Sequence, residues 1–147
     1  MKKIIAKPHI FFFILIPVII CVGQFNREKY IAIDISYIQN KIHYDSMTYF
    51  FALFFGLVGL NYFSLYWGKK TPNKWMTTIH MLLQMLALLL FFTKDNWNWL
   101  HQDTTSTELN LIINYSNVML ILSLCLFIFS AFIHLINFFT SLIRTPK

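Results

Sequence analysis

Two histidines are the residues of this sequence whose type and spacing could do chemistry. His80 follows Trp75 by five residues. At a helical rise of about 1.5 Å per residue, it lies about 8 Å inside the end of its segment. His134 precedes Arg144 by ten residues and lies at a similar depth, because the long arginine side chain can extend to the surface. Two imidazoles at one depth on different helices could ligate a haem iron from opposite sides, transfer a proton, or simply bind polar neighbours.

Further uncharged polar residues occur at this depth in the same apolar stretches. Asn61 precedes Trp67 by six residues, and Gln84 lies one helical turn beyond His80 on the same face. Within hydrocarbon an unsatisfied polar group is costly, so these side chains should face another helix or a cavity. The sequence therefore predicts one buried polar cluster, made of Asn61, Thr77, His80, Gln84, Ser130, His134 and Asn137.

Small and polar residues also recur at the spacing of one helix face. In the last apolar stretch four of them follow one another at intervals of seven: Ser116, Ser123, Ser130 and Asn137. The second stretch has a matching face, formed by Thr48, Ala52, Gly56 and Gly59. Such faces allow close helix packing, with interhelical hydrogen bonds worth about 0.6 kcal/mol each. We expect both faces to pack against neighbouring helices.

The elements that position these residues are four apolar stretches. Of the 147 residues, 57% are hydrophobic and 12% are charged, whereas a soluble domain has about 25% charged residues. A helix needs about 20 residues to cross the hydrocarbon core, and the stretches cover residues 9–25, 46–67, 75–93 and 111–143. The sequence predicts an all-α integral membrane protein, in which residues 1–147 form a single domain, a bundle of four transmembrane helices.

Charge is distributed unevenly about these stretches. The N-terminus, the second loop and the C-terminus carry eight basic residues and no acidic one, whereas the other two loops carry four basic and all six acidic residues. By the positive-inside rule both termini are cytoplasmic, as we expect for a multi-pass protein of the bacterial inner membrane. The net charge of +6 thus marks orientation, and no nucleic-acid partner is predicted. The first stretch lacks a good cleavage site, which predicts a retained anchor.

The first outer loop contains an alternating pattern. From Tyr30 to Tyr37, isoleucines alternate with smaller or polar residues, which is the period of a half-buried strand. We therefore expect a short extended segment over the helix ends. The chain has no CxxC, HExxH, GxSxG or glycine-rich phosphate motif, so motifs predict neither soluble-type enzyme chemistry nor a metal site.

Part of the sequence resembles a known family. The residues that carry the likeness lie between about 30 and 92 and comprise Asp34-Ile35-Ser36-Tyr37, His43-Tyr44, Gly56, Gly59, Lys74-Trp75 and Ile79-His80. They look like the tenth and eleventh helices of haem–copper oxidase subunit I. The whole layout resembles the small four-helix membrane proteins of Bacteroidetes that are labelled subunit-I-like from this stretch.

The chain departs from the oxidase pattern at positions that matter for the metals. It has Ile33 where the family has the histidine before the aspartate, and Lys41 where the first histidine of the following helix would stand. The metal and haem positions implied by the resemblance therefore transfer only to Asp34 and His43. Oxidase catalysis by this chain is not expected. The resemblance implies descent from such a module, or association with a respiratory complex.

Three functional hypotheses follow from these observations. The first is a non-catalytic accessory or assembly subunit of a larger membrane complex, with a respiratory complex suggested by the resemblance. Its partners would be the lipid bilayer and other membrane subunits, and it would need no cofactor. The second is an electron carrier that binds haem through His80 and His134, with a Soret band that disappears when either is replaced by alanine. The third is a small transporter or proton path through the buried polar cluster.

Overall fold

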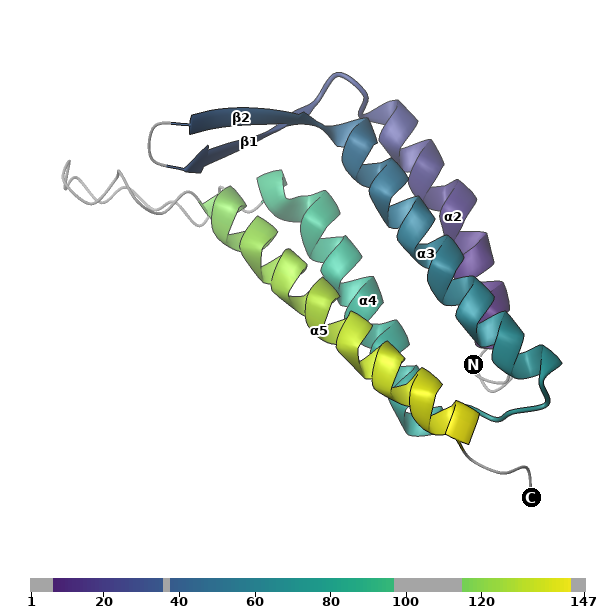
Figure 1. The fold of residues 1–147 in the computed structure, drawn as a ribbon. Coiled ribbons are helices and arrows are strands. Elements are labelled where there is room, and N and C mark those ends of the chain that lie inside the picture. Colours follow the sequence, from purple (N-terminus) through teal and green to yellow (C-terminus); the bar gives the residue numbers. More distant parts are fainter. Residues whose placement is uncertain (1–6, 36–37, 97–114, 144–147) are drawn as a thin grey trace. The chain divides into compact units, whose positions relative to one another are not determined.

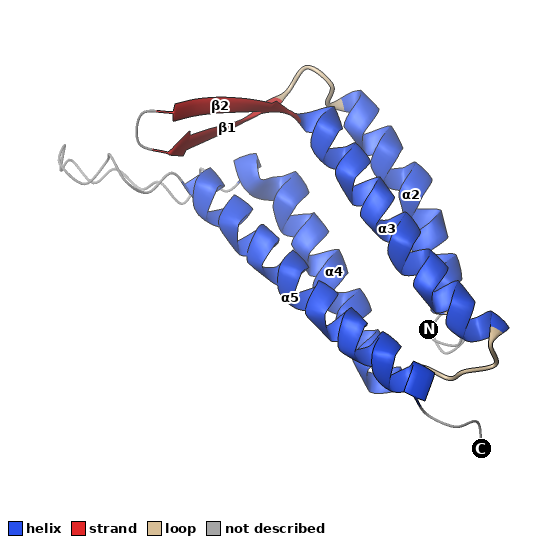
Figure 2. Cartoon of the chain, in the orientation of Figure 1, coloured by secondary structure: helices blue, strands red, loops and turns tan. Residues whose placement is uncertain are grey.

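Four α-helices account for most of the computed structural model, which describes residues 7–35, 38–96 and 115–143. They are α2 (Pro8–Phe25), α3 (Tyr44–Trp67), α4 (Lys74–Thr93) and α5 (Tyr115–Ile143) (Figures 1 and 2). All four are long and apolar enough to cross a membrane, as predicted for a multi-pass helical protein. Their bounds lie close to the predicted ones, although the predicted start of the last helix, residues 111–114, lies outside the described residues.

The helices belong to two compact parts of the chain. The first contains α2, two strands and α3, together with the last residues of α5, and the second contains α4 and most of α5. In the first part, α2 begins at Pro8, where a missing N–H leaves no helical hydrogen bond unmade. The glycine that follows α3, Gly68, is its C-cap. Proline at the start and glycine past the end are typical helix bounds.

The extended segment predicted in the first outer loop is one strand of a two-stranded sheet. β1 (Tyr30–Ile35) pairs antiparallel with β2 (Ile38–His43), with Tyr30 opposite His43. Periodicity indicated only the first strand, because the sequence of β2, Ile-Gln-Asn-Lys-Ile-His, does not alternate between apolar and polar residues. The Tyr44 N–H donates to the Lys29 carbonyl at 3.1 Å, which joins the base of the hairpin to the start of α3.

Aromatic side chains form the core between α2 and α3. The fully buried ring of Phe12 in α2 stacks on two rings of α3, Phe55 at 5.9 Å and Tyr62 at 5.7 Å between centroids. Offset-stacked rings at such distances are favourable beyond the apolar area that they bury. The two helices run side by side along their length (Figure 1), so this stack lies inside a continuous interface.

Glycines allow close approach of the helices in the same interface. A Cβ on Gly23 of α2 would stand 2.8 Å from the Cβ of Thr48, and one on Gly59 would stand 2.7 Å from the ring of Phe13. The predicted small face of α3 therefore contacts α2 at Thr48 and Gly59. Gly56 has more space, since its nearest atom would be 3.8 Å away on Ile16.

Candidate functional site

Buried polar side chains line one face of α4 and one face of α5. On α4, Thr77, His80 and Gln84 are spaced three and four residues apart and are fully buried, so they share one face. On α5 the buried polar residues keep the same spacing and comprise Ser123, Ser130, His134, Asn137 and Ser141. Ser116 lies in α5, but its side chain is outside the described residues.

Hydrogen bonds join His80 of α4 to Ser130 of α5. The His80 Nδ1 lies 2.8 Å from the Ser130 Oγ and 3.0 Å from the Ser130 carbonyl oxygen. The Ser130 hydroxyl in turn donates to the His80 carbonyl at 3.0 Å. A carbonyl oxygen only accepts, and the hydroxyl hydrogen is already used. We therefore expect the hydrogen of the neutral imidazole on Nδ1, which satisfies all three contacts and would leave the lone pair on Nε2.

The second histidine packs against the first. The His80 and His134 rings are stacked, with centroids 4.9 Å apart and planes inclined by 27°. Ser130 and His134 lie one helical turn apart on α5, which explains why His80 contacts both. Axial haem ligation would place the porphyrin between the two rings, with one nitrogen of each aimed at the iron. Stacked rings leave no space for a porphyrin between them, so this arrangement is that of a packed pair.

A second hydrogen bond crosses between α4 and α5 two turns away. The Ser123 hydroxyl donates to the Ala87 carbonyl at 2.8 Å. Between this bond and the histidine pair lies Gln84, whose Nε2 and Oε1 are buried without a hydrogen-bond partner in the described part of the chain. Burying an amide without hydrogen bonds costs free energy, unless water or a ligand supplies the missing partners.

The two asparagines of the predicted cluster belong to the first compact part of the chain. Asn61 is half-buried on α3 in the α2·α3 pair, where its carbonyl accepts from the Ser64 hydroxyl at 2.8 Å. The Asn137 side-chain oxygen accepts from the N–H of Asn73, in the loop before α4, at 2.9 Å. The main-chain carbonyl of Asn137 accepts from the Ser141 hydroxyl at 2.6 Å. The Asn137 side chain thus binds the backbone of the loop before α4.

The residues that the oxidase resemblance singles out lie in the hairpin. Asp34 is on β1 opposite Gln39, and His43 ends β2 with its exposed ring 4.5 Å from that of Tyr30. Within the ranges that the structure describes, no three His, Cys, Asp or Glu side chains come together as metal ligands.

Comparison with known proteins gives no relative for this chain. No family model, no curated protein and no solved structure matches it.

Proposed function

We propose that this protein is a non-catalytic accessory or assembly subunit of a larger complex in the bacterial inner membrane, with both termini cytoplasmic. The observation that carries the proposal is the β-hairpin between α2 and α3. It extends from the end of two apolar helices (Figure 2), so it would stand outside the bilayer as a structured element available to a partner.

The hairpin is built in a way that suits strand addition. The sheet has two strands among the described residues, so each strand has one edge without a neighbouring strand there. A two-stranded sheet is marginally stable alone in water, and unpaired edges accept a further strand from another protein. A partner that pairs with the hairpin would complete a sheet of three or more strands. The resemblance to oxidase subunit I favours a respiratory complex as the class of partner.

Replacing residues 31–42 by a Gly/Ser linker should abolish this association. The expected result is loss of the partners that co-purify with the tagged full-length chain from native membranes in mild detergent. Because α2 and α3 keep their own core, membrane insertion and helix content should remain unchanged, which circular dichroism checks.

A matched control is a variant with the same linker length inserted after Lys70, which leaves the hairpin intact. Co-purification that is equal in the hairpin variant and in the wild-type chain would contradict the proposed role of the hairpin. A wild-type chain that purifies alone would contradict the subunit proposal itself.

The buried amide of Gln84 favours a second candidate function, a proton path through α4 and α5. An unsatisfied amide one turn from the His80 and His134 pair is a place where water would bind. The lone pair on the His80 Nε2 could accept a proton from that water. Hydrated polar residues inside a membrane segment are typical of proton relays.

In liposomes that contain the purified chain and a pH-sensitive dye, an imposed pH gradient should then collapse faster than in empty liposomes. Gln84→Leu should return the rate to that of empty liposomes, because leucine fills the space without binding water. Met85→Leu, at an exposed position of α4, serves as the control and should keep the wild-type rate. A wild-type rate equal to that of empty liposomes would contradict the proton path.

A further inference from the structure

The register of the β-hairpin separates apolar from polar residues between its two faces. Residues two apart on a strand share a face of the sheet, and so do residues directly opposite each other on paired strands. One face therefore carries every isoleucine of the two strands and one asparagine: Ile31, Ile33, Ile35, Ile38, Asn40 and Ile42. The other face carries Tyr30, Ala32, Asp34, Gln39, Lys41 and His43. We call the first the isoleucine face.

The exposure of side chains at the base of the hairpin shows which way the isoleucine face is turned. Ile31 is 2% exposed, whereas its neighbour Tyr30, on the other face, is 53% exposed. The same contrast occurs on β2, where Ile42 is half-buried between the exposed Lys41 and His43. At its base, the isoleucine face is thus turned toward the rest of the chain, and the polar face is turned away from it.

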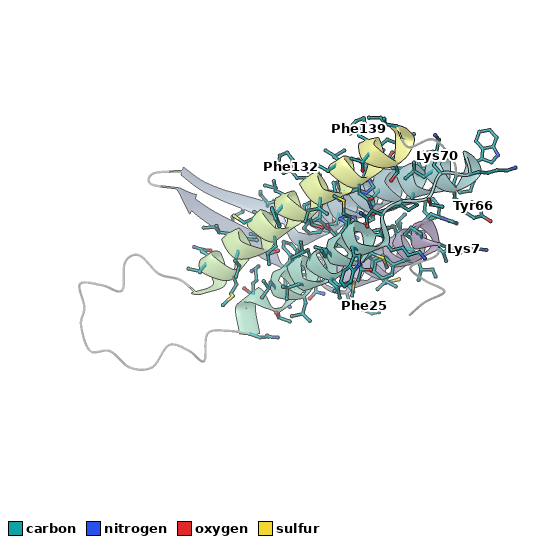
Figure 3. The ribbon with its side chains drawn as sticks, turned by 90° about the horizontal axis from the view of Figure 1, so that it is seen from below. Lys7, Phe25, Tyr66, Lys70, Phe132 and Phe139 are labelled. Carbon is teal, nitrogen blue, oxygen red and sulfur yellow. The ribbon has the colours of Figure 1, made fainter. Side chains whose placement is uncertain are left out.

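The length of α3 sets the level of the hairpin relative to a membrane. Figure 3 shows Lys7 and Tyr66 at the end of the α2·α3 pair that lies away from the hairpin. Tyr66 and Trp67 are 52% and 82% exposed, which is typical of aromatic residues at a membrane–water interface. From Tyr44, its first residue, to Tyr66, α3 rises by about 33 Å, and the hydrocarbon core is about 30 Å thick. With Tyr66 at one interface, Tyr44 therefore reaches the opposite one.

The hairpin leaves α3 at this level without a linker. β2 ends at His43 and α3 begins at Tyr44, and the bond from the Tyr44 N–H to the Lys29 carbonyl holds the start of β1 at the same point. The hairpin turns aside from the axis of α3 instead of continuing it (Figure 1). Its strands of six residues are about 20 Å long, whereas a helix is about 10–12 Å wide. The strands are therefore long enough to reach beyond the width of α3.

We propose that the isoleucine face lies on the surface of the lipid bilayer, with its side chains at the boundary between headgroups and acyl chains. An amphipathic element at the interface buries its apolar face to this depth and keeps its polar face in water. For helices that cross a membrane, the side of the hairpin turned toward the rest of the chain is the bilayer side. This inference rests on α3 crossing a membrane. It leaves the strand edges available and needs no partner subunit, so failure of the co-purification experiment would leave it unaffected.

The test is a spin-label scan of residues 31–42 in the full-length chain, in liposomes of phosphatidylethanolamine and phosphatidylglycerol that contain no other protein. The native cysteines, Cys21 and Cys125, are first replaced by alanine, and a nitroxide is then attached to one introduced cysteine at a time. Oxygen concentrates in lipid, whereas a charged or polar nickel chelate stays in water. The accessibility of each label to these two reagents therefore distinguishes lipid, water and a protein interior.

The accessibility should alternate with a period of two residues. Labels in place of Ile33, Ile35 and Ile38 should be accessible to oxygen and protected from nickel, and labels in place of Asp34 and Gln39 should show the reverse. Low accessibility to both reagents at the isoleucine positions would mean that protein covers this face, either this chain or a second copy, and would overturn the proposal. High nickel accessibility at every position would place the whole hairpin in water and overturn it as well.

Two matched variants test whether the isoleucines themselves hold the hairpin on the membrane. With the label at Ile38, the double variant Ile33→Thr with Ile35→Thr should raise nickel accessibility to the value measured with the label at Gln39. Threonine keeps the β-branched shape that favours a strand but removes apolar surface. Asp34→Asn, on the opposite face, should leave the label at Ile38 protected. Unchanged protection in the double variant would contradict the proposed role of the isoleucine face.

Discussion

Gly23→Ala should destabilise the protein by about 1–3 kcal/mol, the range for overpacking a well-packed interface. The added methyl would stand 2.8 Å from the Thr48 Cβ and closer still to its Oγ1. Thr48 cannot turn away cheaply, because it is β-branched, 1% exposed, and bound through its hydroxyl to the Asp45 carbonyl at 2.7 Å. The two helices would have to separate, which would also loosen the aromatic stack in their interface.

Two other glycines of the same interface provide graded controls. At Gly56 a methyl would meet only ordinary contact at 3.8 Å, so Gly56→Ala should leave stability unchanged or raise it by up to about 1 kcal/mol through helix propensity. Gly59→Ala should lie between the two, because the Phe13 ring that it meets is 36% exposed and can move. The free energy of unfolding, measured by SDS titration in mixed micelles, should rank the variants in this order. A Gly23→Ala variant as stable as Gly56→Ala would contradict the close approach.

The helices could be predicted from the sequence, because each apolar stretch by itself has the length and composition of a membrane-spanning helix. The sequence could not predict which helix packs against which face of another. The small residues Thr48 and Gly59 indicated a packed face on α3, but Gly23, which faces Thr48, is a single glycine in an apolar stretch with no pattern around it. Which helices pack together depends on rotation about the helix axes and on loop geometry. The periodicity of the sequence gives no information about either.

Residue spacing also predicted only part of the histidine site. Counting residues placed His80 and His134 at one depth, but depth alone is compatible with axial ligands, a proton relay or a packed pair. The stacking of the rings and the bonds to Ser130 depend on the rotamers and on the facing of α4 and α5. Asn61 has a similar depth by counting, yet it belongs to the α2·α3 pair. Depth cannot assign a residue to a helix pair.

The largest effect expected in the α4·α5 pair is that of His80→Ala. We expect a loss of about 2–5 kcal/mol in the free energy of unfolding, the range for truncating a large buried side chain to alanine. The substitution leaves a cavity against His134 and removes the bonds to the Ser130 hydroxyl and carbonyl. Ser130→Ala alone should cost less, because the carbonyl still accepts from the His80 Nδ1.

A double-mutant cycle isolates the interaction between the two side chains. The coupling energy between His80→Ala and Ser130→Ala should be about 0.6–1.7 kcal/mol, the range of interhelical hydrogen bonds measured in membrane proteins. Ser123→Ala is the matched control, since its hydroxyl bonds the Ala87 carbonyl and not His80. It should combine additively with His80→Ala. Coupling of equal size in both cycles would mean that the substitutions act through general loosening of the helix pair.

The tautomer of His80 can be tested by ¹⁵N NMR of the ring-labelled protein. We expect the hydrogen on Nδ1, because the Ser130 carbonyl can then accept from the ring while the Ser130 hydroxyl donates to the His80 carbonyl. Ser130→Ala should keep this tautomer, since the carbonyl remains in place. A hydrogen on Nε2 would contradict the bonding between His80 and Ser130. It would also count against the proton path, because Nε2 would then lack the lone pair needed to accept a proton.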